Sequence, residues 1–154
     1  MTKYKLRPLE SINEIILHCS ATPAKMDIGA KEIRQWHVRG NGWVDIGYHF
    51  VIRRSGVIEE GRPLQAIGAH CSNHNAHSIG ICLVGGTKGD AKTPENNFTD
   101  EQFKAAAELI KRLEKRLPGI QSIVGHNRYA AKACPVFDVT EFKNNYLEVA
   151  GDGD

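Results

Sequence analysis

The chain has 154 residues, a length that suits one domain with its own hydrophobic core. Hydrophobic residues make up 41% and charged residues 25%, which excludes a disordered or fibrous protein. The net charge is only +2 and the basic residues are dispersed, so composition gives no electrostatic footprint for direct nucleic-acid binding. No apolar run reaches the length of a signal peptide or a membrane helix, and we expect a cytoplasmic protein that does not enter the membrane.

The predicted organisation is a single domain over residues 1–154, with an N-terminal extension at 1–12 and a flexible tail at 148–154. Four cysteines are few for this length, and a cytoplasmic setting keeps thiols reduced. We therefore expect no disulfide framework. We also expect the chain to be a monomer.

The first half of the chain predicts strands and one helix in alternation. Residues 14–19 are short, apolar and β-branched, as in a buried strand. Residues 29–39 have helical periodicity that places Trp36 on the buried face. Residues 48–53 and 57–60 flank an Arg-Ser-Gly turn and predict a β-hairpin.

The second half continues this alternation. Residues 78–84 alternate bulky and small side chains, as in a central strand with close packing on one side. After a loop, Thr99 opens a capping box for a long helix that ends at Leu117. A strand over 121–125 and a last helix over 138–147 follow. The predicted fold class is α/β (mixed α+β), with one central mixed β-sheet flanked by about three helices.

Three side chains could bind a metal at one edge of this sheet. His18 and His126 both stand at the carboxyl ends of predicted strands, where sites of such sheets lie, and Cys134 follows in a loop. Two imidazoles and a thiolate leave a fourth position open, as in catalytic zinc sites. The competing interpretation is that these are ordinary buried residues, because their spacing matches no short zinc motif.

A rival cluster, His70-Cys71-Ser-Asn-His74-Asn-Ala-His77, offers four potential ligands within eight residues. It has no regular C-x2-C or H-x3-H spacing. We therefore interpret it as a polar loop in preference to a metal site.

Seven ordered blocks extend these local patterns to nearly the whole chain. They are His18-Cys-Ser-Ala-Thr22, Glu32-Ile-Arg-Gln-Trp-His37, Gly42-Trp-Val-Asp-Ile-Gly-Tyr-His-Phe50, Gly56-Val-Ile-Glu-Glu-Gly-Arg62, Ser78-Ile-Gly-Ile-Cys-Leu-Val-Gly-Gly86, Asn97-Phe-Thr99 and Lys132-Ala-Cys-Pro135. Together they resemble the zinc-dependent N-acetylmuramoyl-L-alanine amidases of the type-2 amidase and peptidoglycan-recognition family, in particular the short phage lysozymes of amidase type.

This resemblance implies a mixed sheet with an open groove over one Zn²⁺ per chain. Its zinc ligands fall on His18, His126 and Cys134, and its two further catalytic residues fall on Tyr48 and Lys132. The implied substrate is peptidoglycan, cleaved at the amide between N-acetylmuramic acid and L-alanine.

The resemblance also places a loop at the edge of the groove. His70 and Asn75 lie in this loop, where contact with the glycan or peptide and ordinary loop hydrogen bonding are about equally expected.

Simple geometry agrees with the two catalytic assignments. Lys132 precedes Cys134 by two residues, so in an extended segment both side chains project to the same side. Tyr48 is expected on a strand, with His49 facing the opposite way. An ammonium and a phenol near the metal could stabilise an oxyanion or transfer a proton, and the identity of the general base is left open.

Two other functions compete with or accompany catalysis. Relatives that only bind peptidoglycan typically lack the ligand cysteine, so Cys134 favours an enzyme. Short phage lysozymes of this kind also bind and inhibit the single-subunit RNA polymerase of their phage, which makes that polymerase a possible partner. Phage origin would explain an enzyme made in the host cytoplasm and released to the wall through a separate membrane-permeabilising protein.

Overall fold

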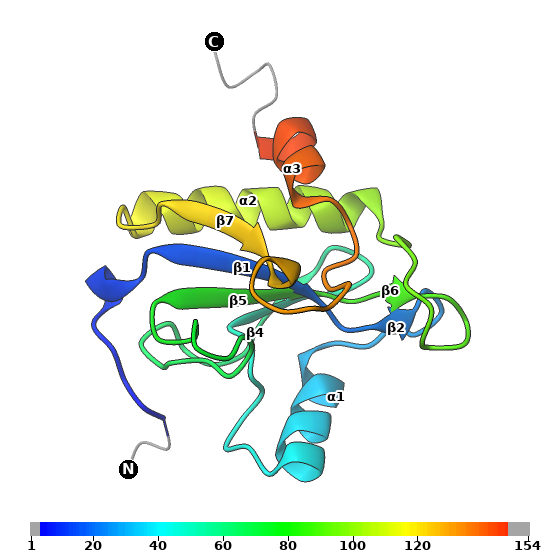
Figure 1. The fold of residues 1–154 in the computed structure, drawn as a ribbon, viewed down its shortest axis with the longest axis horizontal. Helices are drawn as coiled ribbons and strands as arrows, with labels where there is room; N and C mark the ends of the chain where they lie inside the picture. Colours follow the sequence, from blue (N-terminus) through cyan, green and yellow to red (C-terminus); the bar gives the residue numbers. More distant parts are fainter. Residues whose placement is uncertain (1–3, 148–154) are drawn as a thin grey trace.

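The computed structural model describes residues 4–147 (Figure 1). The tail expected at 148–154 lies outside the described residues. Five strands form the main sheet in the order β4-β3-β5-β1-β7: β1 (Glu14–Cys19), β3 (Phe50–Ile52), β4 (Ile58–Glu60), β5 (Ser78–Leu83) and β7 (Ser122–Gly125). Two short strands pair separately: β2 (Thr22–Pro23) and β6 (Gly86–Thr87). The helices and helical turns are η1 (Leu9–Ser11), α1 (Ala30–Gln35), η2 (Trp36–Gly40), α2 (Asp100–Arg116), η3 (His126–Arg128), α3 (Val139–Phe142) and η4 (Lys143–Leu147).

The sheet is mixed, as predicted. β1 lies between β5 and β7 and runs parallel to both, β3 runs parallel to β5, and only the edge strand β4 is antiparallel. β1, β5 and β7 therefore run in the same direction across Figure 1. The carboxyl ends of the first and last strands meet at one edge of the sheet, although the whole domain separates them in sequence.

The two faces of the sheet bury different side chains. On one face, Ile15, Leu17 and Ile81 pack with Ile110 and Leu113 of α2 in the larger core cluster. On the other face, α1 contributes to a smaller cluster formed by Ala30, Ile33, Ile46, Val51, Cys82 and Val84. Figure 1 shows α1 and α2 on opposite sides of the sheet. Because strand side chains alternate, the even-numbered residues of β1, including His18, face the α1 side.

The long helix α2 forms as the sequence predicts. The Thr99 side chain accepts a hydrogen bond from the Gln102 backbone N–H at 3.1 Å, and the Gln102 side chain accepts one from the Thr99 N–H at 3.0 Å. This reciprocal capping box satisfies two backbone donors that the first helical turn leaves unpaired. The last helix also begins as predicted, because Asp138 accepts a hydrogen bond from the Glu141 N–H.

The prediction that Trp36 is buried is wrong, since 42% of its surface is exposed. The α-helix ends at Gln35, and the chain continues as the five-residue π-helical turn η2. A wider turn changes which side chains face inward, so the 3.6-residue period no longer applies. His37 faces inward instead, and its Nδ1 accepts a hydrogen bond from the Gly47 N–H at 2.9 Å.

The hairpin is confirmed, but it is shorter than expected. β3 begins at Phe50, so Tyr48 precedes the strand instead of standing on it. Its backbone is still fixed, because its carbonyl accepts a hydrogen bond from Arg62 N–H at 3.0 Å. At the turn, Gly56 has φ +94°, a conformation that side chains rarely adopt, which accounts for glycine there.

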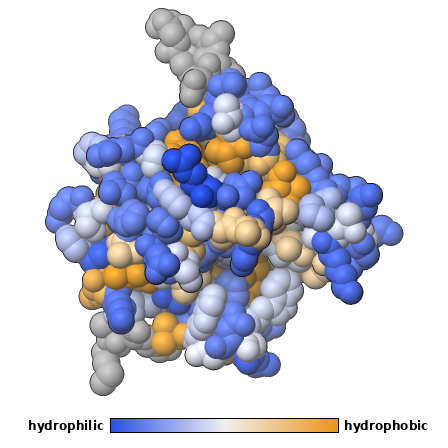
Figure 2. Space-filling model, in the orientation of Figure 1, coloured by the Kyte–Doolittle hydropathy of each residue, from blue (hydrophilic) through white to orange (hydrophobic). Residues whose placement is uncertain are grey.

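The described part of the N-terminal segment packs against the domain. Leu6 bridges to Ala66, and Arg7 is buried, with its guanidinium donating to the carbonyls of Leu64 and Ser78. Figure 2 shows that hydrophilic side chains cover most of the face in view, with hydrophobic ones in separate patches. Among residues 4–147, no helix has both the length and the apolar character needed to span a bilayer.

Candidate metal centre

The parallel pairing of β1 with β7 brings two of the predicted ligands together. Leu17 of β1 pairs with Gly125 of β7. His18 and His126 each follow directly after one residue of this pair, so they lie side by side at the carboxyl ends of the two strands. Their rings lie 4.6 Å apart between centroids. The sheet topology thus produces the juxtaposition that the strand-end argument predicted.

Cys134 completes a three-ligand cluster with these histidines. One ligand atom from each of His18, His126 and Cys134 lies within 4.8 Å of the others. The Cys134 Sγ is 3.9 Å from His18 Nδ1 and accepts a hydrogen bond from the Cys19 backbone N–H at 3.2 Å. Two imidazole nitrogens and one sulfur are donor types that zinc takes in catalytic sites, so the residues present fit that metal.

A chain of hydrogen bonds fixes the His18 ring in a ligating orientation. Ser78 Oγ donates its only proton to the His74 carbonyl at 2.6 Å, so it must accept from His70 Nε2 at 3.3 Å. His70 Nδ1 is then an acceptor, and it takes the proton of His18 Nε2 at 2.8 Å. The remaining nitrogen, His18 Nδ1, keeps its lone pair and faces Cys134.

Gly80 makes room for this arrangement. A Cβ added to Gly80 would lie 2.6 Å from Cγ of His70 and 2.8 Å from its Nδ1, closer than real Cβ atoms come to a neighbour. The His70 ring therefore packs directly on the backbone of the central strand β5. The close packing that the sequence predicted for one side of this strand is confirmed.

Electrostatics keeps both histidines neutral. Burial, followed by the charges of His126 and Lys132, holds the pKa of His18 well below its usual value. Burial and Lys132 likewise lower the pKa of His126. Neutral imidazole is the form that ligates metals, so near neutral pH neither ring needs to lose a proton first.

The thiol behaves differently. The neighbouring Cys19 side chain, together with burial, raises the pKa of Cys134. Without a cation the thiol therefore stays protonated at neutral pH, and a bound metal would have to displace that proton.

Tyr48 lies beside the cluster although it precedes the strand. Its ring centroid is 5.1 Å from that of His18 and 5.6 Å from that of His37. Burial, followed by the neighbouring Cys82 and Cys134 side chains, raises the pKa of Tyr48 well above its usual value. The phenol is therefore protonated at neutral pH and can donate a hydrogen bond.

Lys132 lies on the connector between two of the ligands. The connector is closed by the Asn127 N–H, which donates to the Cys134 carbonyl at 2.9 Å. Lys132 is exposed, and its positive charge acts on both histidines by lowering their pKa values. The structure therefore places Lys132 next to the cluster, as its sequence spacing suggested.

A pocket of about 500 Å³ opens beside the cluster. It is lined by His37, Trp43, Tyr48, Ala69, His70, Cys71, Ser72, Asn73, Asn75, His126, Tyr129, Ala130 and Lys132. Both residues predicted to contact substrate, His70 and Asn75, are in this lining. Sequence reasoning did not single out His37 and Trp43 as site residues, although both belong to the blocks that carry the family resemblance. Their rings pack 4.7 Å apart at the pocket wall.

His70 and Asn75 also have contacts inside the protein. His70 is only 9% exposed and bonds His18. The Asn75 Oδ1 accepts hydrogen bonds from the N–H groups of His70 and Cys71, both at 2.9 Å. Each therefore supports the pocket wall, and their contact with substrate stays a prediction.

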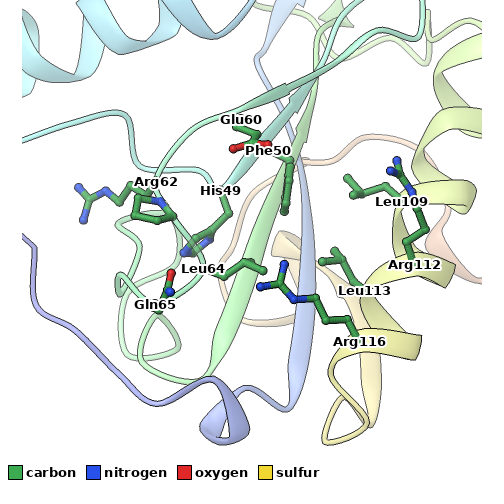
Figure 3. Close-up of a pocket in the computed structure, with 11 residues that line it drawn as sticks. His49, Phe50, Glu60, Arg62, Leu64, Gln65, Leu109, Arg112, Leu113 and Arg116 are labelled. Carbon is green, nitrogen blue, oxygen red and sulfur yellow. The ribbon is translucent and has the colours of Figure 1, made fainter.

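A second pocket, of about 450 Å³, lies on the opposite side, between α2 and the β3–β4 hairpin (Figure 3). Leu113 and Arg116 of α2 approach it from one side, with Phe50 and Leu64 on the other. Arg62 at its edge donates to the carbonyls of Ile46 and Ile67. This pocket contains none of the predicted site residues.

Comparison with known proteins gives consistent matches over most of the chain. The profile of the N-acetylmuramoyl-L-alanine amidase family matches residues 8–137. The endolysin of Klebsiella phage KP32 is 46% identical over 140 residues, which cover 90% of each chain. The solved endolysin amidase LysCS from Clostridium intestinale URNW has a TM-score of 0.77 at 28% identity, covering 97% of this chain and 94% of the other. Bumblebee PGRP-SA has a TM-score of 0.74 at 26% identity, covering 96% and 91%. These matches confirm the family resemblance and the fold class expected from the sequence.

Proposed function

Because the chain belongs to the N-acetylmuramoyl-L-alanine amidase family, we propose that it is an endolysin that hydrolyses peptidoglycan with one Zn²⁺ held by His18, His126 and Cys134. The proposed scissile bond is the amide between N-acetylmuramic acid and L-alanine of the stem peptide. The observation that carries the proposal is the convergence of the three ligand atoms within 4.8 Å. Tyr48, His126 and Lys132 of the adjoining pocket would then face the bound substrate.

The proposed chemistry divides between the metal and the chain. When bound, zinc with three protein ligands supplies a Lewis acid and a nucleophile at neutral pH, which an unactivated amide requires. Lys132 holds a positive charge at the pocket where an oxyanion forms, and Tyr48 offers a protonated phenol. His70 orients His18 through their 2.8 Å hydrogen bond.

A direct test measures the release of stem peptides from purified cell wall. The proposal expects activity that a chelator removes and added Zn²⁺ restores. A Cys134→Ser variant should bind zinc more weakly and lose activity. Full activity of this variant, or activity that a chelator leaves intact, would contradict the proposal. His37→Gln serves as a matched control for metal content, because His37 lies outside the ligand cluster.

We further propose that the protein acts on the wall after release from the host cytoplasm, and that it binds and inhibits a phage single-subunit RNA polymerase. Support for this partner comes from the similarity to phage endolysins. Transcription by such a polymerase, measured with increasing concentrations of the protein, tests it. No change in transcription at micromolar protein would contradict the second role and leave the amidase proposal intact.

A further inference from the structure

A second group of metal-ligating side chains lies at the other end of β1. Glu14, His74 and His77 each offer one ligand atom, and these atoms lie within 4.8 Å of one another. Glu14 and His18 face the same side of β1 but are four residues apart, which in a strand is roughly 13 Å. The second group is therefore separate from the first.

The carboxylate of this group is buried and incompletely paired. The Glu14 side chain is only 7% exposed. Its Oε2 accepts hydrogen bonds from Ser122 Oγ at 2.9 Å and from Tyr129 Oη at 2.7 Å. Its Oε1 is buried without a hydrogen-bond partner among the described residues, and His77 Nε2 lies 3.8 Å away. A buried carboxylate oxygen without a partner is unfavourable unless a cation or donor satisfies it.

The two histidines are held in place by the backbone and by ring packing. The His77 carbonyl accepts a hydrogen bond from the Asn13 N–H at 2.9 Å, beside Glu14. The His74 carbonyl accepts from Ser78 Oγ, and the His74 ring stacks on Tyr129 with centroids 3.6 Å apart. The ligands therefore come from a positioned loop and a strand.

We propose that Glu14, His74 and His77 form a second divalent metal site. Two imidazoles and one carboxylate are the ligand set that Zn²⁺ and related transition metals take when no thiolate is present. A metal here satisfies Glu14 Oε1 and joins the start of β1 to the loop that carries His74 and His77. This proposal assigns a metal-binding role to His74 and His77, which are interpreted from the sequence alone as part of a polar loop. The third ligand, Glu14, comes from β1.

The site has a structural role through Tyr129. This residue donates to Glu14, stacks on His74 and lines the pocket beside the first cluster. Asn75, between the two histidines, lines the same pocket. A metal held by Glu14, His74 and His77 thus fixes two parts of the pocket wall relative to the sheet.

Cobalt(II) added to metal-free protein distinguishes the two sites by spectrum. A site with a cysteine ligand gives a thiolate-to-metal charge-transfer band, whereas a site with only histidine and glutamate ligands gives none. We expect two equivalents of Co²⁺ to bind the wild-type chain, one of each kind. His77→Gln should weaken only the second by at least about tenfold, the lower end of what losing even an outer-shell partner costs. His77 is partly exposed, so this variant should fold.

Two further variants separate this proposal from the proposed function. Cys134→Ser should lose the charge-transfer band and keep the second equivalent, and its melting temperature should rise with added Zn²⁺. Adding His77→Gln to that variant should make the rise smaller at the same zinc concentration, whereas His37→Gln alone should leave both equivalents in place. The proposal is overturned if the wild type binds no Co²⁺ equivalent that lacks a charge-transfer band, or if that equivalent binds unchanged in His77→Gln. Failure of the first site alone leaves intact the equivalent that binds without a charge-transfer band.

Discussion

Replacing Gly80 with alanine tests whether the His70 ring positions the metal centre. The new Cβ would lie 2.6 Å from Cγ of His70, whereas ordinary contact begins at 3.4 Å. Gly80 does not have a positive φ, so the substitution acts through contact with the ring and not through backbone strain. The ring must therefore move by about 0.8 Å. A movement of that size along the hydrogen bond between His70 Nδ1 and His18 Nε2 lengthens it from 2.8 Å to about 3.6 Å, which is too long for a hydrogen bond.

Two magnitudes follow from this displacement. Overpacking of a buried site costs about 1–3 kcal/mol, which lowers the melting temperature of a domain of this size by roughly 2–12 °C. Loss of the partner that orients His18 should weaken zinc binding by about 10–100-fold. Competition with a chromophoric chelator measures the affinity, and thermal unfolding of the metal-free chain measures the stability.

Two variants make the result interpretable. Gly89→Ala is the matched control, because a Cβ there meets nothing within 4 Å, and both quantities should be unchanged. Adding His70→Ala to Gly80→Ala removes the overlap, so stability should partly recover while zinc affinity stays low. If Gly80→Ala lowers stability but leaves zinc affinity at the wild-type value, the His70 ring does not orient His18 and the reasoning fails.

Three further predictions concern catalysis, metal loading and stability. Tyr48→Phe and Lys132→Met should each lower kcat by about 10²–10⁴-fold in the stem-peptide assay with zinc content unchanged, and loss of zinc would reassign the residue to metal binding. Zinc affinity should rise by about tenfold per pH unit between about pH 7 and about pH 8. In this range the raised pKa of Cys134 makes the metal displace one proton, whereas His18 and His126, whose pKa values are lowered, are already neutral; a flat profile in isothermal titration would contradict this. Thr99→Ala should lower the free energy of unfolding by about 1 kcal/mol through loss of the α2 cap, whereas Thr99→Ser should retain most of it, as measured by thermal unfolding.

The sheet and its first cluster were predictable because their signals are local. Each strand is a short apolar run with turns at both ends. Parallel strands place their carboxyl ends at the same edge of the sheet, so His18 and His126 are expected there whichever strands are neighbours. The capping box of Thr99 likewise identifies a helix start by itself. These features need no knowledge of which segments touch.

The parts that could not be predicted depend on contacts between distant segments or on a local change of helix type. Nothing in the period around Trp36 indicates that the helix widens to a π turn after Gln35. The proposed role of His74 and His77 depends on Glu14, about sixty residues earlier, which the β1–β5 register brings close by pairing Glu14 with Ser78. A single sequence does not reveal which strands pair or in which register. From the sequence alone, residues 70–77 are therefore interpreted as a polar loop.

The position of β1 between β5 and β7 also has a consequence for the order in which the protein is assembled. The hydrogen bond from Ser122 to Glu14 joins residues 108 apart, and the contact between Cys134 and His18 joins residues 116 apart. Contacts of such long range form late, because the loop they close costs entropy before it is repaid. A chain still emerging from the ribosome holds His18 long before it holds His126 or Cys134. The candidate metal centre is therefore incomplete until Cys134 has been made, and it forms only as β7 docks beside β1.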